Sequence, residues 1–154
     1  MNTGGTACAS PMDLSAVPMG ADGAIHVMGD NTSAQMGTTI PTVCIDPMFG
    51  YAGYQVAYRY TMRATGILTA STVSMNTALT LDTVVQIAAG CDSAAATLGC
   101  NDDVSSSVRQ STAASWSVID AGTAVFILVG GFVSPMVPST PQGPFELILR
   151  EGST

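Results

Sequence analysis

The chain contains no lysine, so its only permanent positive charges come from four arginines: Arg59, Arg63, Arg109 and Arg150. Charged residues make up 10% of the 154 positions, against about 25% in an average globular protein. The net charge of -7 therefore reflects a shortage of basic residues and not an acidic run. Because binding to nucleic acid needs many cations to neutralise phosphates, the composition argues against nucleic acid as a partner.

Long hydrophobic runs are also missing. The longest, residues 124–133, contains two glycines and has the length of a strand, whereas a membrane-spanning helix needs about 20 consecutive apolar residues. We therefore expect no membrane span. Residues 1–6 contain neither the basic nor the apolar segment of an export signal, which leaves an upstream leader, a trimmed start and a cytoplasmic origin open.

The sequence has one histidine, no C-x-x-C pair and no G-x-S-x-G motif. Zinc is the rival to disulfides for the four cysteines, but the C-x-x-C spacing is missing and the one histidine is far from the late cysteines. The nucleophile motif of a serine hydrolase is missing as well. His26 lies in a short alternating segment and is expected to be an ordinary exposed or hydrogen-bonded side chain. We predict that the protein is not an enzyme.

What the sequence does contain is strand periodicity. Residues 55–62 and 144–150 alternate between apolar and polar positions, and shorter strand-like segments occur at 24–29, 67–72, 83–88, 113–119 and 123–129. The pattern predicts an all-β, antiparallel β-sandwich or jelly roll of about seven to nine strands. We expect one domain over residues 1–154, with residues 1–23 as a candidate extended arm. Trp116 is expected in the core between the sheets.

Four cysteines, Cys8, Cys44, Cys91 and Cys100, allow three disulfide pairings. Proximity in the sequence favours Cys91–Cys100, which leaves Cys8–Cys44. Disulfides form in oxidising compartments, so this interpretation predicts a secreted, extracellular or cell-surface protein.

Several of the few acidic residues are close to the late cysteines. Asp82, Asp92, Asn101, Asp102 and Asp103 offer the hard oxygen ligands that calcium prefers, and calcium is the one candidate cofactor. The other interpretation is structural: Asp82 and Asp103 would accept backbone N–H bonds and fix a turn. Both remain open from the sequence.

A series of short motifs resembles a known family. They are YRYT (58–61), ATG (64–66), LDTV (81–84), GCD (90–92), CNDD (100–103), DAG (120–122), VGGF (129–132) and GPFEL (143–147). Their order and spacing are similar to those of the bacterial pre-peptidase C-terminal domain and related extracellular β-sandwich modules. The resemblance covers about residues 55–150.

The resemblance implies a jelly-roll-like sandwich, secretion and no catalytic residues of its own. Modules of this kind accompany secreted hydrolases or belong to cell-surface proteins, and some relatives bind calcium. One departure is that the family often has Asp where this chain has Gly130. If that carboxylate holds a cation in relatives, its loss here weakens the case for a metal.

The low charge also bears on function, since a soluble monomer usually has a charged surface. We therefore expect a non-enzymatic extracellular structural protein, a homo-oligomer or homopolymer that forms a filament, sheath or surface layer. The alternative is an accessory module of a secreted hydrolase that binds a protein or a polysaccharide. Tyr51 and Tyr54, in a glycine-rich segment, are the candidate binding residues for such a ligand.

Overall fold

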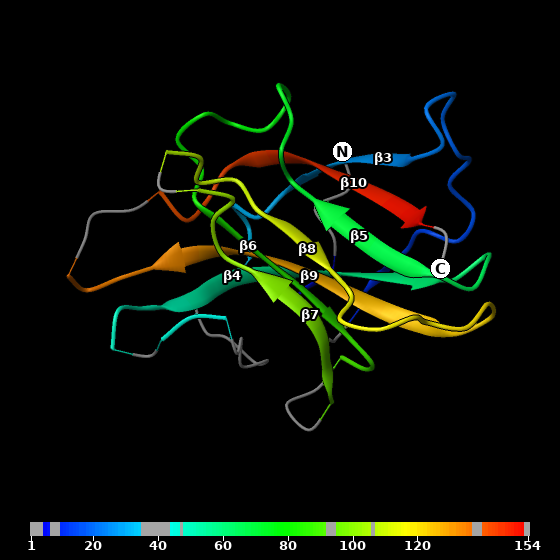
Figure 1. The fold of residues 1–154 in the computed structure, drawn as a ribbon. Coiled ribbons are helices and arrows are strands. Elements are labelled where there is room, and N and C mark those ends of the chain that lie inside the picture. Colours follow the sequence, from blue (N-terminus) through cyan, green and yellow to red (C-terminus); the bar gives the residue numbers. More distant parts are fainter. Residues whose placement is uncertain are drawn as a thin grey trace.

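The computed structural model describes residues 5–6, 10–34, 44–46, 48–91, 95–105, 107–136 and 140–152. These residues contain ten strands (Figure 1), and no helix among them is long and apolar enough to cross a membrane. The strands are β1 (Gly5–Thr6), β2 (Met12–Asp13), β3 (Ile25–Asp30), β4 (Tyr51–Thr61), β5 (Ile67–Ser71), β6 (Thr83–Ala88), β7 (Thr97–Asn101), β8 (Thr112–Ala114), β9 (Ala124–Val133) and β10 (Pro144–Gly152).

The strands form two sheets. One has the order β1-β4-β9-β6-β7, with β2 also paired to β4, and the other has the order β3-β10-β5-β8. Strands β3 to β10 pair from the outside inwards, as β3–β10, β4–β9, β5–β8 and β6–β7, all antiparallel. Pairing of β10 with β5 and of β9 with β6 then rolls this nested arrangement into two sheets. This connectivity is the jelly roll, so the predicted fold class is confirmed.

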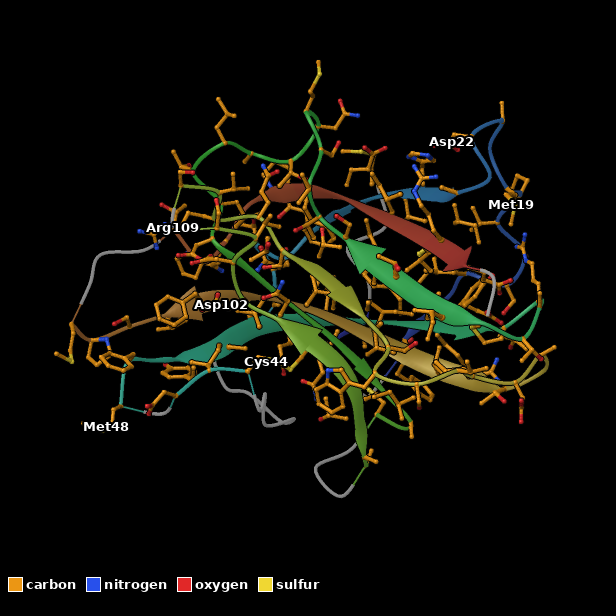
Figure 2. All side chains as sticks on the ribbon, viewed as in Figure 1. Met19, Asp22, Cys44, Met48, Asp102 and Arg109 are labelled. Atoms are coloured by element: carbon orange, nitrogen blue, oxygen red, sulfur yellow. A yellow bond between two sulfur atoms is a disulfide. The ribbon has the colours of Figure 1, made fainter. Side chains whose placement is uncertain are left out.

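Alternating strand directions bring four connections to one end of the sandwich, which we call the loop end. It comprises the described parts of the β3–β4, β5–β6, β7–β8 and β9–β10 connections: residues 31–34, 44–46, 48–50, 72–82, 102–105, 107–111, 134–136 and 140–143. These connections lie towards the left of Figure 1, with the β5–β6 connection at the top and the described part of the β3–β4 connection at the lower left. Met48, Asp102 and Arg109 lie at this end, and Met19 lies at the opposite end (Figure 2).

The core lies between the sheets and follows the predicted alternation. Tyr58 and Tyr60 of β4 point inwards and are almost completely buried, as are Phe145, Leu147 and Leu149 of β10. The rings of Tyr58 and Phe145 meet edge to face, with centroids 6.5 Å apart. Large aromatic side chains from facing strands therefore fill the centre of the sandwich.

Trp116 does not belong to this core, and its predicted burial is wrong. The residue is 63% exposed. Ala113 and Ser115 are buried, so the period of two along this edge directs the alternate positions, Ala114 and Trp116, to solvent.

The outer face of β6 is also covered, since all six residues of this strand are buried. Two small apolar clusters lie apart from the main core. One contains Ala88 and Leu128 packed against Cys91, and the other contains Ile45, Ala52 and Val84 packed against Phe132. The second cluster shows that the β3–β4 connection contributes a side chain to this layer.

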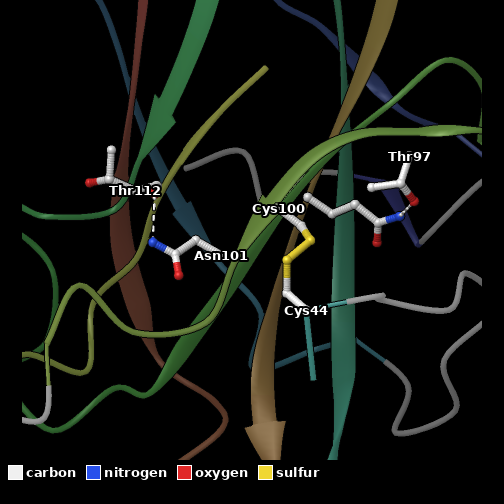
Figure 3. Close-up of a disulfide and its surroundings, with 6 residues drawn as sticks. Cys44, Thr97, Cys100, Asn101 and Thr112 are labelled. Carbon is white, nitrogen blue, oxygen red and sulfur yellow. Dashed lines mark hydrogen bonds between the residues drawn. A yellow bond between two sulfur atoms is a disulfide. The ribbon is translucent and has the colours of Figure 1, made fainter. Parts of the chain in front are cut away.

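A disulfide between Cys44 and Cys100 fixes that connection to the sheet (Figure 3). The two Cα atoms are 5.9 Å apart. Cys100 lies in β7, three strands and roughly 14 Å from β4, where the connection ends. The cross-link therefore holds the β3–β4 connection over the opposite edge of the sheet.

The predicted pairs Cys91–Cys100 and Cys8–Cys44 are wrong, because Cys44 is bonded to Cys100. Strand register explains why. Cys100 is opposite Gln86, whereas Cys91 lies beyond the hydrogen bond from Ala89 N to Ala96 O, at the far end of the hairpin. Cys91 is itself disulfide-bonded, and Cys8 lies outside the described residues.

We predict that peptide mapping under non-reducing conditions recovers a Cys44–Cys100 cross-linked peptide. Removing this bond in a Cys44→Ser/Cys100→Ser variant should lower the free energy of unfolding by about 4 kcal/mol, because the cross-link closes a loop with a sequence separation of 56. Recovery of a Cys91–Cys100 peptide from native protein would contradict the assignment.

Gly29 provides a test of core packing. A Cβ atom at this position would collide with the hydroxyl of Tyr58 and the ring of Phe145. Gly29→Ala should therefore lower the free energy of unfolding by roughly 1–3 kcal/mol, measured by chemical denaturation. Gly152→Ala is the matched control, since the nearest atom to its added Cβ is 3.6 Å away, and a change as large as that of Gly29→Ala would refute the packing argument.

Candidate metal centre

Three of the predicted ligand residues meet at the loop end. Asp82 precedes β6, and Asp102 and Asp103 follow β7. Because β6 and β7 form an antiparallel hairpin in which Val85 is opposite Asn101, the start of one strand lies beside the end of the other. One carboxylate oxygen from each aspartate lies within 4.8 Å of the other two.

The backbone holds Asp82 in place from both sides. Its N–H donates to the carbonyl of Thr140 at 2.9 Å, and its carbonyl accepts from the N–H of Phe132, also at 2.9 Å. Its side chain is only 4% exposed. Asp82 is thus a fixed, buried carboxylate at the base of the loop end.

The carboxylates are poorly compensated. The Oδ1 atoms of Asp82, Asp102 and Asp103 are all buried, and none has a hydrogen-bond partner. The expected turn-fixing role of Asp82 and Asp103 is therefore wrong, because no backbone N–H among the described residues donates to either side chain. Buried polar atoms without a partner are rare in native proteins and call for a specific explanation.

Arg109 supplies the one guanidinium in contact with this cluster in the described structure. Its Nη1 donates to Oδ2 of Asp82 at 3.2 Å, and its side chain is half exposed. One positive charge faces three acids, so the cluster keeps an excess of negative charge when all three are ionised. Sequence reasoning missed Arg109, although it is the only basic residue between Arg63 and Arg150.

The environment disfavours the ionised forms. Burial, followed by the charge of Asp103, raises the pKa of Asp82 to about 6 and the pKa of Asp102 to about 7. Burial raises the pKa of Asp103 as well, while the charge of Arg109 opposes that change. At neutral pH the folded protein therefore holds charge that is costly without a cation.

The donor set fits a hard divalent cation such as calcium. Calcium binds carboxylate and carbonyl oxygens and uses six to eight of them, so Asp82, Asp102 and Asp103 would supply the charged part of the shell. A bound cation would give the orphaned oxygens a partner and offset their repulsion. The chemistry it would supply here is structural, because it would link the β5–β6 and β7–β8 connections.

The side-chain amide of Asn101 has a structural contact. Its Nδ2 donates to the carbonyl of Thr112 at 2.9 Å, so the side chain ties β7 to β8 (Figure 3). This contact gives Asn101 a structural role, and its predicted role as a metal ligand stays a prediction. Asp92 lies outside the described residues.

The glycine at position 130 does not remove a ligand from this site. A Cβ atom there would approach Gln55, Gly53 and Ala52, none of which belongs to the acidic cluster. The departure from the family pattern at Gly130 therefore does not weaken the case for a cation at Asp82, Asp102 and Asp103.

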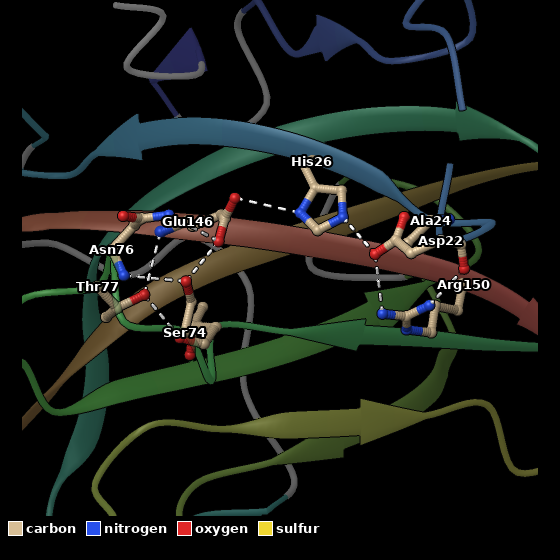
Figure 4. A network of polar contacts seen from close by, with 9 residues as sticks. Asp22, Ala24, His26, Ser74, Asn76, Thr77, Glu146 and Arg150 are labelled. Atoms are coloured by element: carbon tan, nitrogen blue, oxygen red, sulfur yellow. Dashed lines mark hydrogen bonds and ion pairs between the residues drawn. The ribbon is translucent and has the colours of Figure 1, made fainter. Parts of the chain in front are cut away.

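His26 is an exposed, hydrogen-bonded residue, as expected. Its Nε2 lies 2.8 Å from Oδ2 of Asp22 and its Nδ1 lies 3.2 Å from Oε2 of Glu146 (Figure 4). The hydrogen bond with Asp22 is the main cause that raises the pKa of His26. Both ring nitrogens are engaged by carboxylates, so the imidazole is not placed to activate a hydroxyl nucleophile.

The two candidate binding tyrosines differ in their surroundings. Tyr51 begins β4 and is exposed, whereas Tyr54 is half-buried and has a φ of 53°. Such a value is unusual for a residue other than glycine, and it coincides with a β-bulge between Gly53 and Val56. Asn31, in an N-x-S/T motif, is buried, and its side chain binds Pro141 and Gly143, so it is not available for glycosylation in the folded chain.

Comparisons with protein-family models, with curated proteins and with solved structures find no match for this chain. The similarity to the pre-peptidase C-terminal domain therefore rests on the residues quoted above and stays a prediction.

We predict that millimolar calcium raises the melting temperature at pH 8 by roughly 5–10 °C when its concentration is a hundredfold above Kd. At pH 5 the shift should disappear, because Asp82 and Asp102 are then protonated. Without calcium, the raised pKa values mean that the folded cluster binds protons more tightly than the unfolded chain. Its contribution to the free energy of unfolding therefore decreases as the pH rises from about 4 to about 7.

The matched control is Asp102→Asn, which preserves shape and removes one charge. The variant should melt higher than the wild type at pH 8 without calcium and should lose most of the calcium response. The pKa of His26 is also raised, so its stabilising contribution is lost over an overlapping pH range, and the comparison of the two proteins separates the cluster from that background. A calcium shift that persists undiminished in Asp102→Asn would exclude this site.

Proposed function

We propose that this chain is a non-enzymatic extracellular structural subunit that assembles with copies of itself into a filament, sheath or surface layer. The observation that carries the proposal is a set of large apolar side chains exposed at the loop end: Met48, Phe49, Val73, Met75, Leu79, Val104 and Met136. Monomeric proteins rarely expose so many apolar side chains in one region, and such regions are typical of interaction surfaces.

The rest of the surface agrees with this role. Charged residues are few, so the chain has little of the charged coat that keeps monomers apart at high concentration. The disulfide between Cys44 and Cys100 supports an oxidising, extracellular location. The engagement of both nitrogens of His26 by carboxylates supports a role without catalysis.

A second candidate function is an accessory binding module of a secreted hydrolase. It is favoured by the exposure of Phe49 and Tyr51 close together in the sequence, beside the strained backbone of Tyr54. Aromatic side chains of this kind can contact a protein or polysaccharide polymer. The aliphatic and methionine side chains that dominate the loop end favour a protein surface over a sugar.

Sedimentation velocity and negative-stain microscopy over a wide range of protein concentration test the proposal. We expect the average mass to rise with concentration and regular assemblies to appear. A monodisperse monomer at millimolar concentration, with or without calcium, would contradict self-assembly. Saturable binding of that monomer to an insoluble polymer, lost in Tyr51→Ala, would then favour the accessory module.

A further inference from the structure

The β5–β6 connection, residues 72–82, combines exposed apolar side chains with a buried end. Met75 is 99% exposed and Leu79 is 90% exposed, and Val73 is exposed as well. Leu81, near the end of the same connection, is completely buried, so the segment has a firmly packed base and an apolar outer side.

Hydrogen bonds fix the base of this connection. Thr72 and Thr77 are buried, and Oγ1 of Thr77 donates to the carbonyl of Thr72 at 2.6 Å. Thr77 Oγ1 also accepts from the N–H of Glu146 at 3.1 Å, while the N–H of Ala78 donates to the carbonyl of Pro144 at 3.0 Å. The connection is thus joined to the start of β10.

The turn that displays Met75 is held on both sides by one carboxylate. Ser74 Oγ and Asn76 Nδ2 both donate to Oε1 of Glu146, and the N–H of Asn76 donates to Ser74 Oγ at 3.0 Å (Figure 4). The hydrogen bond from Ser74 is the largest of several contacts that lower the pKa of Glu146, so this carboxylate stays ionised. Met75 is therefore presented on a fixed turn.

Further polar contacts extend from Glu146 along the outer face of the β3-β10-β5-β8 sheet. Its Oε2 contacts His26, His26 contacts Asp22, and Asp22 accepts from Nη2 of Arg150 at 3.2 Å (Figure 4). These contacts connect β3 with β10 and anchor the carboxylate that organises the turn. A turn whose backbone is held in this way loses little backbone conformational entropy when a partner covers it.

We infer that residues 73–79 form the contact through which one copy of this chain docks on another. The inference rests on the proposed self-assembly and names the surface that carries it. Met75 and Leu79 are the central apolar contacts, and Glu146 is a positioning residue that acts through Ser74 and Asn76.

The amount of apolar surface fits a protein partner. Burying a side chain such as Met, Leu or Val contributes about 1.5–3 kcal/mol, which corresponds to roughly 60–120 Å² apiece. Val73, Met75 and Leu79 supply part of this area. Together with the other four exposed apolar side chains of the loop end they reach several hundred Å², against the roughly 800 Å² that each partner contributes to a standard interface.

Charge favours a second copy over an anionic lipid surface. Membranes attract clusters of lysine and arginine, but the chain has no lysine and Arg109 is the only basic residue in the described loop end. The carboxylates of Asp82, Asp102 and Asp103 lie at the same end and would repel anionic headgroups. A second copy also carries a net charge of -7, but its charged residues are only 10% of the sequence, so most of its surface opposes the acidic cluster less than a continuous layer of anionic headgroups does.

The test is a Met75→Ser/Leu79→Ser variant compared with a Met19→Ser/Val118→Ser control, which changes two less exposed apolar residues in the connections before β3 and before β9, away from the loop end. Sedimentation velocity with and without calcium measures the association constant of each protein. We expect the loop variant to associate at least tenfold more weakly than the wild type, and the control to associate within threefold of it. Unchanged melting temperatures would show that the substitutions leave the fold intact.

Each failure points to a different conclusion. Equal association of wild type and loop variant would overturn the docking inference and leave self-assembly standing. Absence of association in all proteins would overturn both. Sedimentation of the wild type with vesicles of phosphatidylcholine or of phosphatidylserine, lost in the loop variant while no self-association occurs, would replace the second copy by a lipid surface.

A Glu146→Gln variant tests the positioning role separately. The neutral amide binds Ser74, Asn76 and His26 less strongly, so the Met75 turn should exchange its backbone amide hydrogens faster while Met75 and Leu79 remain in place. Association should weaken less than in the loop variant. Unchanged amide hydrogen exchange at residues 74–77 would show that Glu146 does not position the turn.

Discussion

The antiparallel register of β6 with β7 determines what meets at the loop end. Val85 opposite Asn101 places Asp82 beside Asp102 and Asp103, and Gln86 opposite Cys100 keeps Cys91 out of reach of Cys100. A shift by one residue would reverse the faces of the strand and separate both arrangements. The candidate cation site and the disulfide thus depend on the same ladder of hydrogen bonds.

That register also creates local conflict. Three carboxylates are held together by backbone contacts that favour the jelly roll as a whole, and one arginine compensates them only in part. Electrostatic repulsion that lowers the local stability in this way is typical of functional sites. Asp82 ends the connection that begins with Thr72, so a cation bound there would also stabilise the segment that displays Met75 and Leu79.

Much of the fold was predictable from the sequence because its strands have one clearly buried face. The alternation in residues 55–62 and 144–150 correctly gives the inward sides of β4 and β10. The disulfide was not predictable, since pairing by proximity ignores that an extended hairpin separates Cys91 from Cys100. Trp116 was misplaced because its size suggested the core, while the period of two at Ala113 and Ser115 points it outwards.

The sequence predicts which residue types form the candidate site, but it does not predict which individual residues contact one another there. The sequence indicates Asp82, Asp102 and Asp103 but cannot show that Asn101 turns towards Thr112 or that Arg109 returns from the β7–β8 connection. Those contacts depend on loop conformations that no periodicity encodes. The apolar loop end was equally hidden, because single methionines and leucines in a sequence do not reveal whether they are covered.

We propose that copies of this chain bury the β5–β6 connection when they assemble. The most direct measurement is the rate at which peroxide oxidises each methionine, followed by mass spectrometry, in assembled and in dilute protein. Met75 should be oxidised quickly when dilute and several-fold more slowly when assembled, while Met19 at the opposite end keeps its rate. Equal oxidation rates for Met75 in dilute and in assembled protein would show that assembly does not bury the β5–β6 connection.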